Sequence, residues 1–564
     1  MKYMFNYKKV FIGLMGIILL NASCTKDFLA PDFSVSSAFT QDAVFNTWVE
    51  AEKVLGAAYG YLQNYSGFNM RVGSNRSGTS YLAAYTDEAT NSFIWTGSWN
   101  VTNGTFNQYY NPDDVWNVSY QGIRRCNMYL ENIDKVTDID AVTILRTKME
   151  ARGLRAFYYF ELFKRYGGVP LVTNVMNTTG VLSGNTDDYN QPRKTVDETV
   201  QFIKNELDTV TKYLPPPTPA SAASVGRMNR AISVALKGRL MLYYASPLHN
   251  PAKLTARWQD AALANKQAID TATKYGAALF NNYQTLFTSA SRSASEIIWF
   301  VFQNCGCSLD TYEGMPSLAY GGTNPTLNHI DKYEMRTTGK AIYDAGSGYD
   351  PANPYLNRDP RLGLSVIQAG ELFRGFNYAP WWGPGGADSR STYSKKISDG
   401  SWTGMVFKKF MDPGAAANRN WPLIRLAELY LNYAEALTEG NPTTQAAAFA
   451  AVNTVRARAG VAMPAIAITI SKDSLVKRIR NERDVELAFE EHRNFDARRW
   501  KTAVKDFAGN MYGFRVLYDD ATKKYSFPRY AFQVRKYLPH WDLYPIPQAE
   551  IDKSKGKLVQ NPGY

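Results

Sequence analysis

The chain has 564 residues, of which 45% are apolar and 20% are charged. Its 28 Phe, 12 Trp and 37 Tyr residues supply enough apolar surface for a large core, which excludes a globally disordered protein. The formal net charge is +12, but the basic residues form no dense block, so we expect no nucleic-acid partner.

The first 24 residues have the pattern of a secretory signal. Three lysines precede an uncharged apolar run over residues 10–20, which is too short to span a bilayer. The following Asn21-Ala22-Ser23-Cys24 resembles the cleavage box of bacterial lipoproteins. We therefore expect residues 1–23 to be a signal peptide and Cys24 to be acylated, which would anchor the mature protein to a membrane.

The other cysteines are Cys126, Cys305 and Cys307, and three thiols cannot all pair within one chain. Cys305 and Cys307 could close a small loop disulfide or stay as free thiols. No second Cys or His pair stands at metal-ligand spacing, so a metal site is weakly supported. We expect neither a metal ion nor a cofactor.

Helical periodicity dominates both ends of the chain. Apolar residues recur at helical spacing and stop at Gly, Pro or Asn signals. Helices are predicted over residues 43–62, 116–130, 144–166, 195–213, 229–245, 258–275, 423–437, 444–459 and 471–500. Short connections, with Ala and Tyr recurring on the packing faces, resemble tetratricopeptide-type helix pairs, although the consensus repeat is not cleanly present.

Two segments lack this periodicity. Residues 276–420 and, more briefly, 68–111 are rich in Gly, Asn and aromatic residues. Long irregular segments inside a folded protein usually carry function. We therefore predict a helical scaffold that presents two irregular, aromatic surfaces.

Several sequence motifs, spread over nearly the whole chain, recur together in one known family. They are D-F-L after Cys24, W-x3-Y-x2-I-x3-N over residues 116–127, E-A-R-G-L-R-A-F-Y-Y-F-E-L-F-K-R-Y-G-G-V-P-L over 150–171, R-L-A-E-L-Y-L-N-Y-A-E-A-L over 425–437, V-N-T-V-R-A-R-A-G over 452–460, E-R-D-V-E-L-A-F-E-E-H-R-N-F-D-A-R-R-W over 482–500, Y-P-I-P over 544–547 and Q-N-P-G-Y over 560–564. Their order resembles the SusD/RagB-like outer-membrane nutrient-binding lipoproteins of Bacteroidetes.

This resemblance implies a mainly α fold, with about four tetratricopeptide-like helix pairs in a right-handed superhelical scaffold and a large irregular portion packed on it. Residues 24–564 would form a single domain. It also implies a lipid-anchored, surface-exposed protein of the outer membrane that passes its ligand to a SusC-like TonB-dependent transporter. Members of the family are not enzymes, and they bind glycans or, in the RagB branch, peptides.

The candidate ligand-binding residues are aromatic. Sugar rings stack their C–H faces on indole or phenol rings, while polar side chains fix the hydroxyls. Trp95, Trp99 and Asn100 lie in the earlier irregular segment, where members of the resembled family commonly place stacking residues. In the later irregular segment the candidates are Tyr320, Trp381 and Trp382. Each tryptophan could instead pack in a satellite core.

Acidic residues suggest catalysis only weakly. Glu486, Glu490, Glu491, His492 and Asp496 would share one helix, but nearby arginines favour charge pairing. A glycosidase needs two carboxyls about 5 to 9.5 Å apart, and Asp87-Glu88 is the best such pair. We therefore expect no enzyme.

Other classes of protein stay open at this point. A glycan-cleaving enzyme is one of them. A helical-repeat adaptor that binds only proteins and a soluble periplasmic binding protein are the others.

Overall fold

The computed structural model describes residues 44–65, 81–176, 191–216, 226–288, 294–304, 313–391, 399–414, 418–440 and 445–564. Cys24, the expected signal peptide, Cys305 and Cys307 lie outside these ranges. Within them, no helix combines the length and apolar character needed to cross a bilayer.

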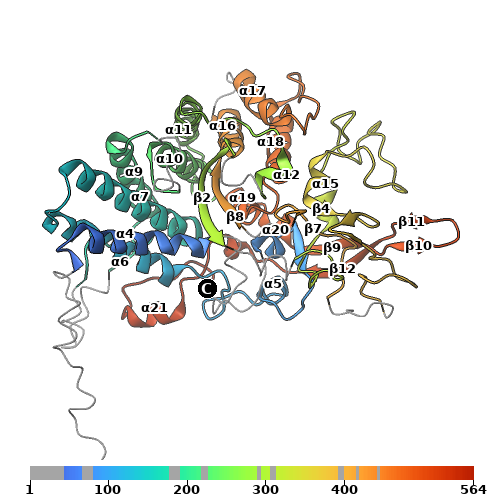
Figure 1. The fold of residues 1–564 in the computed structure, drawn as a ribbon, viewed down its shortest axis with the longest axis horizontal. Coiled ribbons are helices and arrows are strands. Elements are labelled where there is room, and N and C mark those ends of the chain that lie inside the picture. The colour runs from blue at the N-terminus through green and yellow to red at the C-terminus, as the bar shows by residue number, and fades with distance from the viewer. Residues whose placement is uncertain are drawn as a thin grey trace, which may run out of the picture.

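Helices make up most of the regular structure (Figure 1). They are α4 (Trp48–Gly60), α5 (Gly97–Thr102), α6 (Trp116–Asn132), α7 (Ala141–Tyr166), α9 (Val196–Tyr213), α10 (Arg230–Ala245), α11 (Thr255–Lys274), α12 (Tyr283–Leu286), α14 (Leu327–Ile330), α15 (Arg361–Ser365), α16 (Leu426–Gly440), α17 (Gln445–Arg456), α18 (Lys472–Glu486), α19 (His492–Arg499), α20 (Ala503–Phe507) and α21 (Gln548–Lys553). The strands are β1 (Ala89–Asn91), β2 (Ile297–Asn304), β3 (Thr323–Pro325), β4 (Val366–Ile367), β5 (Leu372–Phe373), β6 (Phe376–Asn377), β7 (Val406–Phe407), β8 (Asn418–Arg425), β9 (Gly509–Phe514), β10 (Leu517–Asp519), β11 (Lys524–Ser526) and β12 (Arg529–Arg535).

The long helices pack in sequential pairs. The pairs in the described chain are α4 with α6, α7 with α9, α10 with α11, and α16 with α17, and each pair also contacts the next one. In Figure 1 they follow one another from the left of the molecule to its upper centre. The prediction of a mainly α fold built on helix pairs is confirmed.

The helix ends follow from local sequence. The Thr195 hydroxyl accepts a hydrogen bond from Glu198 N, and the Glu198 carboxylate accepts one from Thr195 N, so a capping box starts α9. Helix α7 ends at Gly167, whose φ of 77° favours glycine. At Gly168 a Cβ atom would come within 2.0 Å of Lys194 O, so the chain that leads into α9 can approach closely.

Two sequence predictions differ from the structure. The helix predicted over 423–437 begins at Leu426, because residues 418–425 form β8, which pairs antiparallel with the distant strand β2. The helix predicted over 471–500 is broken into α18 and α19, with left-handed backbone at Phe489 and Glu491. Glu486 and Glu490 therefore do not lie one turn apart on a single helix.

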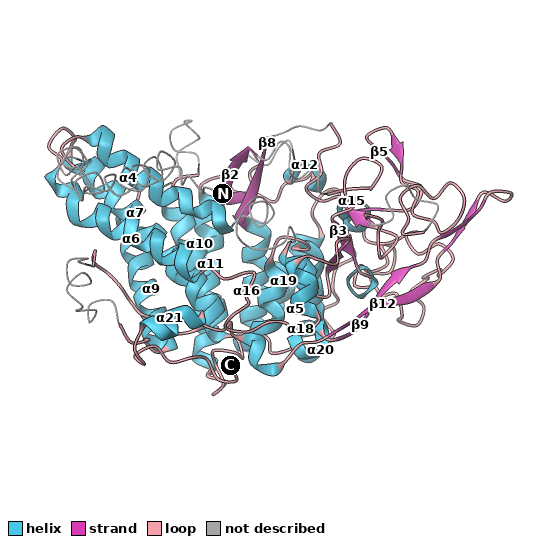
Figure 2. Cartoon of the chain, turned by 90° about the horizontal axis from the view of Figure 1, so that it is seen from below, coloured by secondary structure: helices cyan, strands magenta, loops and turns pink. Residues whose placement is uncertain are grey.

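The irregular portion packs against one end of the helices (Figure 2). The sheets in the described residues are all two-stranded. Besides β2 with β8, the segments predicted to be irregular supply β1 with β3, β4 with β7, and β5 with β6, and residues 509–535 supply β9 with β12 and β10 with β11. The hairpin β10–β11 projects from the far end of the molecule. Residues 276–420 are thus mostly irregular, as predicted, although short strands cross them.

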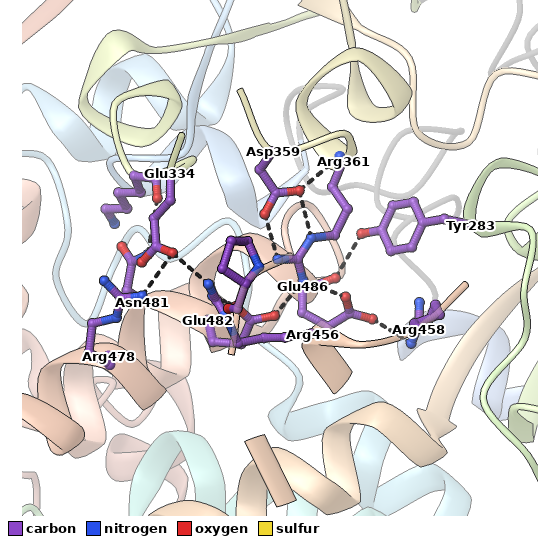
Figure 3. Close-up of polar contacts among 12 residues, drawn as sticks. Tyr283, Glu334, Asp359, Arg361, Arg456, Arg458, Arg478, Asn481, Glu482 and Glu486 are labelled. Carbon is purple, nitrogen blue, oxygen red and sulfur yellow. Dashed lines mark hydrogen bonds and ion pairs between the residues drawn. The ribbon is translucent and has the colours of Figure 1, made fainter. Parts of the chain in front are cut away.

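A buried ion-pair network joins the irregular portion to the helices (Figure 3). Arg361, on α15, donates from Nη1 to Glu482 Oε1 at 2.6 Å and to Glu486 Oε2 at 2.8 Å, and it also binds Asp359. All four side chains are almost completely excluded from solvent. One arginine of the irregular portion is therefore paired with two acids of α18.

Glu486 lies at the centre of this network. Its carboxylate also pairs with Arg425 at 2.6 Å and with Arg458 at 2.8 Å. Burial alone would raise the pKa of Glu486, but Arg458, Arg425 and Arg361 together hold that pKa well below its ordinary value. The charge pairing that the sequence favoured over catalysis is present here.

Replacing Arg361 with methionine should destabilise the protein severely. Because the substitution leaves buried carboxylates of Asp359, Glu482 and Glu486 without one of their cations, we expect a loss of about 3–5 kcal/mol in the free energy of unfolding. Urea unfolding followed by tryptophan fluorescence measures it. The control is Lys266→Ala, which breaks an exposed pair with Asp270 and should shift the midpoint little. Equal shifts for the two variants would contradict the structural role of Arg361.

Candidate ligand-binding surface

The segment that carries Trp95, Trp99 and Asn100 is held by strand pairing. Strand β1 pairs antiparallel with β3, so that Asn91 lies opposite Thr323. Beyond the pair, Ser92 N donates to Gly322 O at 2.8 Å. This pairing brings the earlier irregular segment beside the later one.

Two buried arginines bind the residues just before and within β1. Arg493 forms a two-point ion pair with Asp87, with distances of 2.8 Å from Nε and 3.0 Å from Nη2. Arg535 donates to the carbonyl oxygens of Thr86 and Ala89 at 2.5 and 2.9 Å. Because both arginines are buried, their hydrogen bonds hold this segment in one position.

A first group of rings lies just after β1. The ring of Phe93 stacks on Trp95 with 5.3 Å between centroids and lies 6.4 Å from the ring of Tyr320. Trp95 is 64% exposed and Tyr320 is 43% exposed. Two sequence candidates, Trp95 and Tyr320, therefore meet at the surface through Phe93.

A second group surrounds the end of β1. Trp99 and Trp402 lie 5.4 Å apart, and Trp402 stacks on Phe532 of β12 at 6.3 Å. Their indole N–H groups donate to the carbonyl oxygens of Asn91 and Ser92, at 2.9 and 3.2 Å. Because each indole has a backbone partner, the orientation of both rings is fixed.

Two of the remaining candidates lie further along. Trp382 N donates to Val516 O at 2.8 Å, and the Trp382 ring lies against a guanidinium group, that of Arg515. Trp381 packs on Tyr518 and Tyr525 of the β10–β11 hairpin, at 4.9 and 5.9 Å. Both indoles are half-buried. The two adjacent rings contact different segments: Trp382 lies against Arg515, which follows β9, and Trp381 lies against the β10–β11 hairpin.

Asn100 is exposed and donates from its amide nitrogen to the Tyr110 hydroxyl at 3.0 Å. Sequence reasoning missed Phe93, Trp402 and Phe532 as members of the surface. Trp402 stood in a segment already marked as aromatic and irregular, but Phe532 comes from a β-strand near the end of the chain. No local signal links it to Trp402.

The acidic pair considered for glycoside cleavage is not at this surface. Asp87 is buried and paired with Arg493 and Lys332, and these cations hold its pKa below the ordinary value although burial opposes them. Burial raises the pKa of the Glu88 carboxyl to about 8. Neither carboxyl is placed to contact a sugar.

The second acidic cluster is also engaged in structural contacts. Glu490 binds Lys409 and Arg425, Asp496 binds Arg483, and the Glu491 carboxylate accepts from Leu82 N. In the described ranges, no three or more His, Cys, Asp or Glu side chains are grouped so as to hold a metal ion.

Comparisons with known proteins match the chain to one family of helical proteins. A family model described as the SusD family matches residues 264–564, and one described as starch-binding, associating with the outer membrane, matches residues 46–241. A SusD-like protein of Bacteroides ovatus is 23% identical over 95% of this chain and 91% of its own length. These matches span both the helices and the irregular portion.

Solved structures share the fold. A SusD-like carbohydrate-binding protein of Bacteroides fragilis aligns with a TM-score of 0.74 at 24% identity, over 90% of this chain and 98% of its own. A laminarin-binding SusD-like protein aligns with a TM-score of 0.65 at 22% identity, over 92% of this chain and 100% of its own. Paired helices that carry a large irregular portion thus define a known fold, that of SusD-like proteins. The chain belongs to the SusD family.

Replacing Glu88 with glutamine should change how stability depends on pH. Glu88 accepts a hydrogen bond from Phe489 N at 3.1 Å, which glutamine can also accept. Because the folded-state pKa is raised from 4.5 to about 8, the wild-type protein loses stability as pH rises through that interval. We expect Glu88→Gln to gain about 1–3 kcal/mol relative to wild type between pH 4.5 and 8.5.

Urea unfolding at both pH values measures this difference. The exposed Glu50→Gln serves as the control and should follow the wild-type pH dependence. Parallel stability curves for wild type and Glu88→Gln would show that Glu88 titrates normally.

Proposed function

We propose that this protein captures a glycan at the cell surface and delivers it to a SusC-like TonB-dependent transporter of the outer membrane. It does so without cleaving the glycan. Acylation at Cys24 provides its membrane anchor, and nutrient uptake through a polysaccharide utilization system is its role.

The observation that carries this proposal is the grouping of exposed and half-buried rings around the end of β1. Trp95 and Tyr320 contact Phe93 in one group, and Trp99 and Trp402 contact each other in a second group. Stacking on sugar faces requires rings whose orientation is fixed before binding, since ordering a loose loop would reduce the affinity. Strand pairing and the buried arginines supply that rigidity.

The relatives support the same ligand class. One solved relative is called a carbohydrate-binding protein, another a laminarin-binding protein, and one family model a starch-binding protein. A peptide ligand, as in the RagB branch, is the alternative that the binding test must separate.

Alanine substitutions of the candidate rings should weaken glycan binding. Trp95→Ala, Trp99→Ala and Trp382→Ala should each cost about 1–3 kcal/mol, the usual cost of removing an aromatic anchor. Isothermal titration with the tightest ligand from a polysaccharide and oligosaccharide array measures it. Tyr213→Ala, at an exposed position near the end of α9, is the matched control and should bind as wild type does.

Unchanged affinity in all three tryptophan variants would move the site elsewhere. Retention of peptides, with no glycan retained on the array, would favour the peptide alternative.

Membrane anchoring has its own test. Radiolabelled palmitate should enter the wild-type protein and be absent from Cys24→Ala, and surface protease should digest the wild-type protein on intact cells. Co-purification of a TonB-dependent barrel with the wild-type protein would support the transporter partner. Label that persists in Cys24→Ala would contradict acylation at this residue.

A further inference from the structure

One guanidinium group on the aromatic surface has no polar partner among the residues that the structure describes. Arg515 follows β9, and its backbone N donates to Pro528 O at 2.9 Å, which fixes the chain there. Its guanidinium carbon lies 4.4 Å from the ring centre of Trp382 and 5.6 Å from that of Tyr530. The cation is thus held against two rings by cation–π contacts.

Across the described part of the chain, no hydrogen bond or ion pair links the Arg515 side chain to another residue, and the residue is exposed. Arg390 differs from it. That arginine lies 3.9 Å over Trp402 and donates to Ser92 O and Gly400 O, so its donors hold the loops together. Arg529, on the same strand pair, is matched by Asp331.

Tyr530 links Arg515 to the second group of rings. Tyr530 donates its hydroxyl hydrogen to Trp402 O, and its ring lies 6.5 Å from that of Phe532. Burial raises the pKa of Tyr530 to about 12, with Arg515 and Arg390 both opposing the rise, so both cations act on this ring. Ring contacts therefore run from Trp99 through Trp402 and Phe532 to Tyr530, and Arg515 lies between Tyr530 and Trp382.

A guanidinium held over aromatic rings uses none of its N–H groups in those contacts, so its planar fork of donors stays available for hydrogen bonds. That geometry matches the two oxygens of a sulfate ester or a carboxylate, which an arginine binds by two parallel hydrogen bonds. A neutral sugar would leave this charge without a partner. Residues 24–564 carry a net charge of +9, the +12 of the whole sequence less the three lysines of the expected signal peptide, and this charge adds a long-range attraction for polyanions.

We propose that Arg515 makes the aromatic surface selective for acidic glycans, which carry sulfate or carboxylate groups. This inference rests on the proposed glycan-binding function and narrows its ligand class. Arg515 binds the anionic substituent while the neighbouring rings hold the sugar faces.

The test uses acidic polysaccharides, each paired with its own neutral form. Sulfated polysaccharides are compared with their desulfated forms, and uronic-acid polysaccharides with their carboxyl-reduced forms, by affinity electrophoresis and titration calorimetry on the full mature protein. We expect the acidic form to bind about ten- to a hundredfold more tightly than its neutral form, the range of a charge-assisted contact. The sulfate and carboxylate arms identify which substituent is bound.

Arg515→Gln should remove this preference, so that the acidic and neutral forms bind with affinities within about twofold of each other, and Arg515→Lys should keep only part of it. Arg124→Gln makes the same charge change at an exposed position on α6 and should keep the full preference. Unfolding curves show whether each variant is folded.

Equal binding of acidic and neutral forms would overturn the inference and leave glycan binding intact. A preference that survives in Arg515→Gln would assign charge recognition to another residue and overturn it as well. Absence of binding to every glycan in either form would instead overturn the proposed function.

Discussion

Glu482 and Glu486 lie one turn apart on α18, and their buried carboxylates are neutralised by arginines from three other segments. These segments are α15, the end of β8 and the end of α17. A buried carboxylate without its cation is costly, so an arrangement that displaces any of the three segments is disfavoured. The irregular portion can therefore lack large sheets and long helices and still have one position on the helices. The position of the aromatic loops therefore depends on the ion pairs of Glu482 and Glu486.

Buried arginines also hold the candidate ligand-binding surface in place, with fewer contacts than at Glu486. Just before the rings, Arg493 binds the carboxylate of Asp87 and Arg535 binds backbone carbonyl oxygens, and both arginines are buried. Of the rings beyond this segment, Trp95 and Tyr320 are exposed, and Trp99 and Trp402 are half-buried. Under the proposed function, a surface of this kind would bind by stacking sugar faces on fixed rings and would need no deep pocket.

Sequence periodicity predicted the helix pairs well, because helix formation depends on residues three or four apart and on local caps such as Thr195 and Asn229. It was wrong at β8, whose partner β2 lies more than a hundred residues away, and at the break before α19. At that break, Glu490 and Glu491 turn toward Lys409 and Leu82, contacts that no local pattern encodes. Long-range pairing overrode a helical pattern in both places.

The candidate site was predictable only in part, and for the same reason. Aromatic residues in irregular segments pointed to Trp95, Trp99 and Tyr320, which the fold brings to neighbouring positions. Composition could not assign Trp381 to the β10–β11 hairpin or pair Trp402 with Phe532. Each of those contacts joins residues more than a hundred positions apart.

The carbonyl oxygen of Ser92 accepts hydrogen bonds from both Trp402 and Arg390, across separations of about 300 residues. Contacts between such distant positions form only after most of the chain has been ordered, since closing long loops is entropically costly. The helix pairs, whose contacts are local, can form before the rings are in place. Under the proposed function, the capacity to bind a ligand should therefore arise late in folding, after the helix pairs have formed.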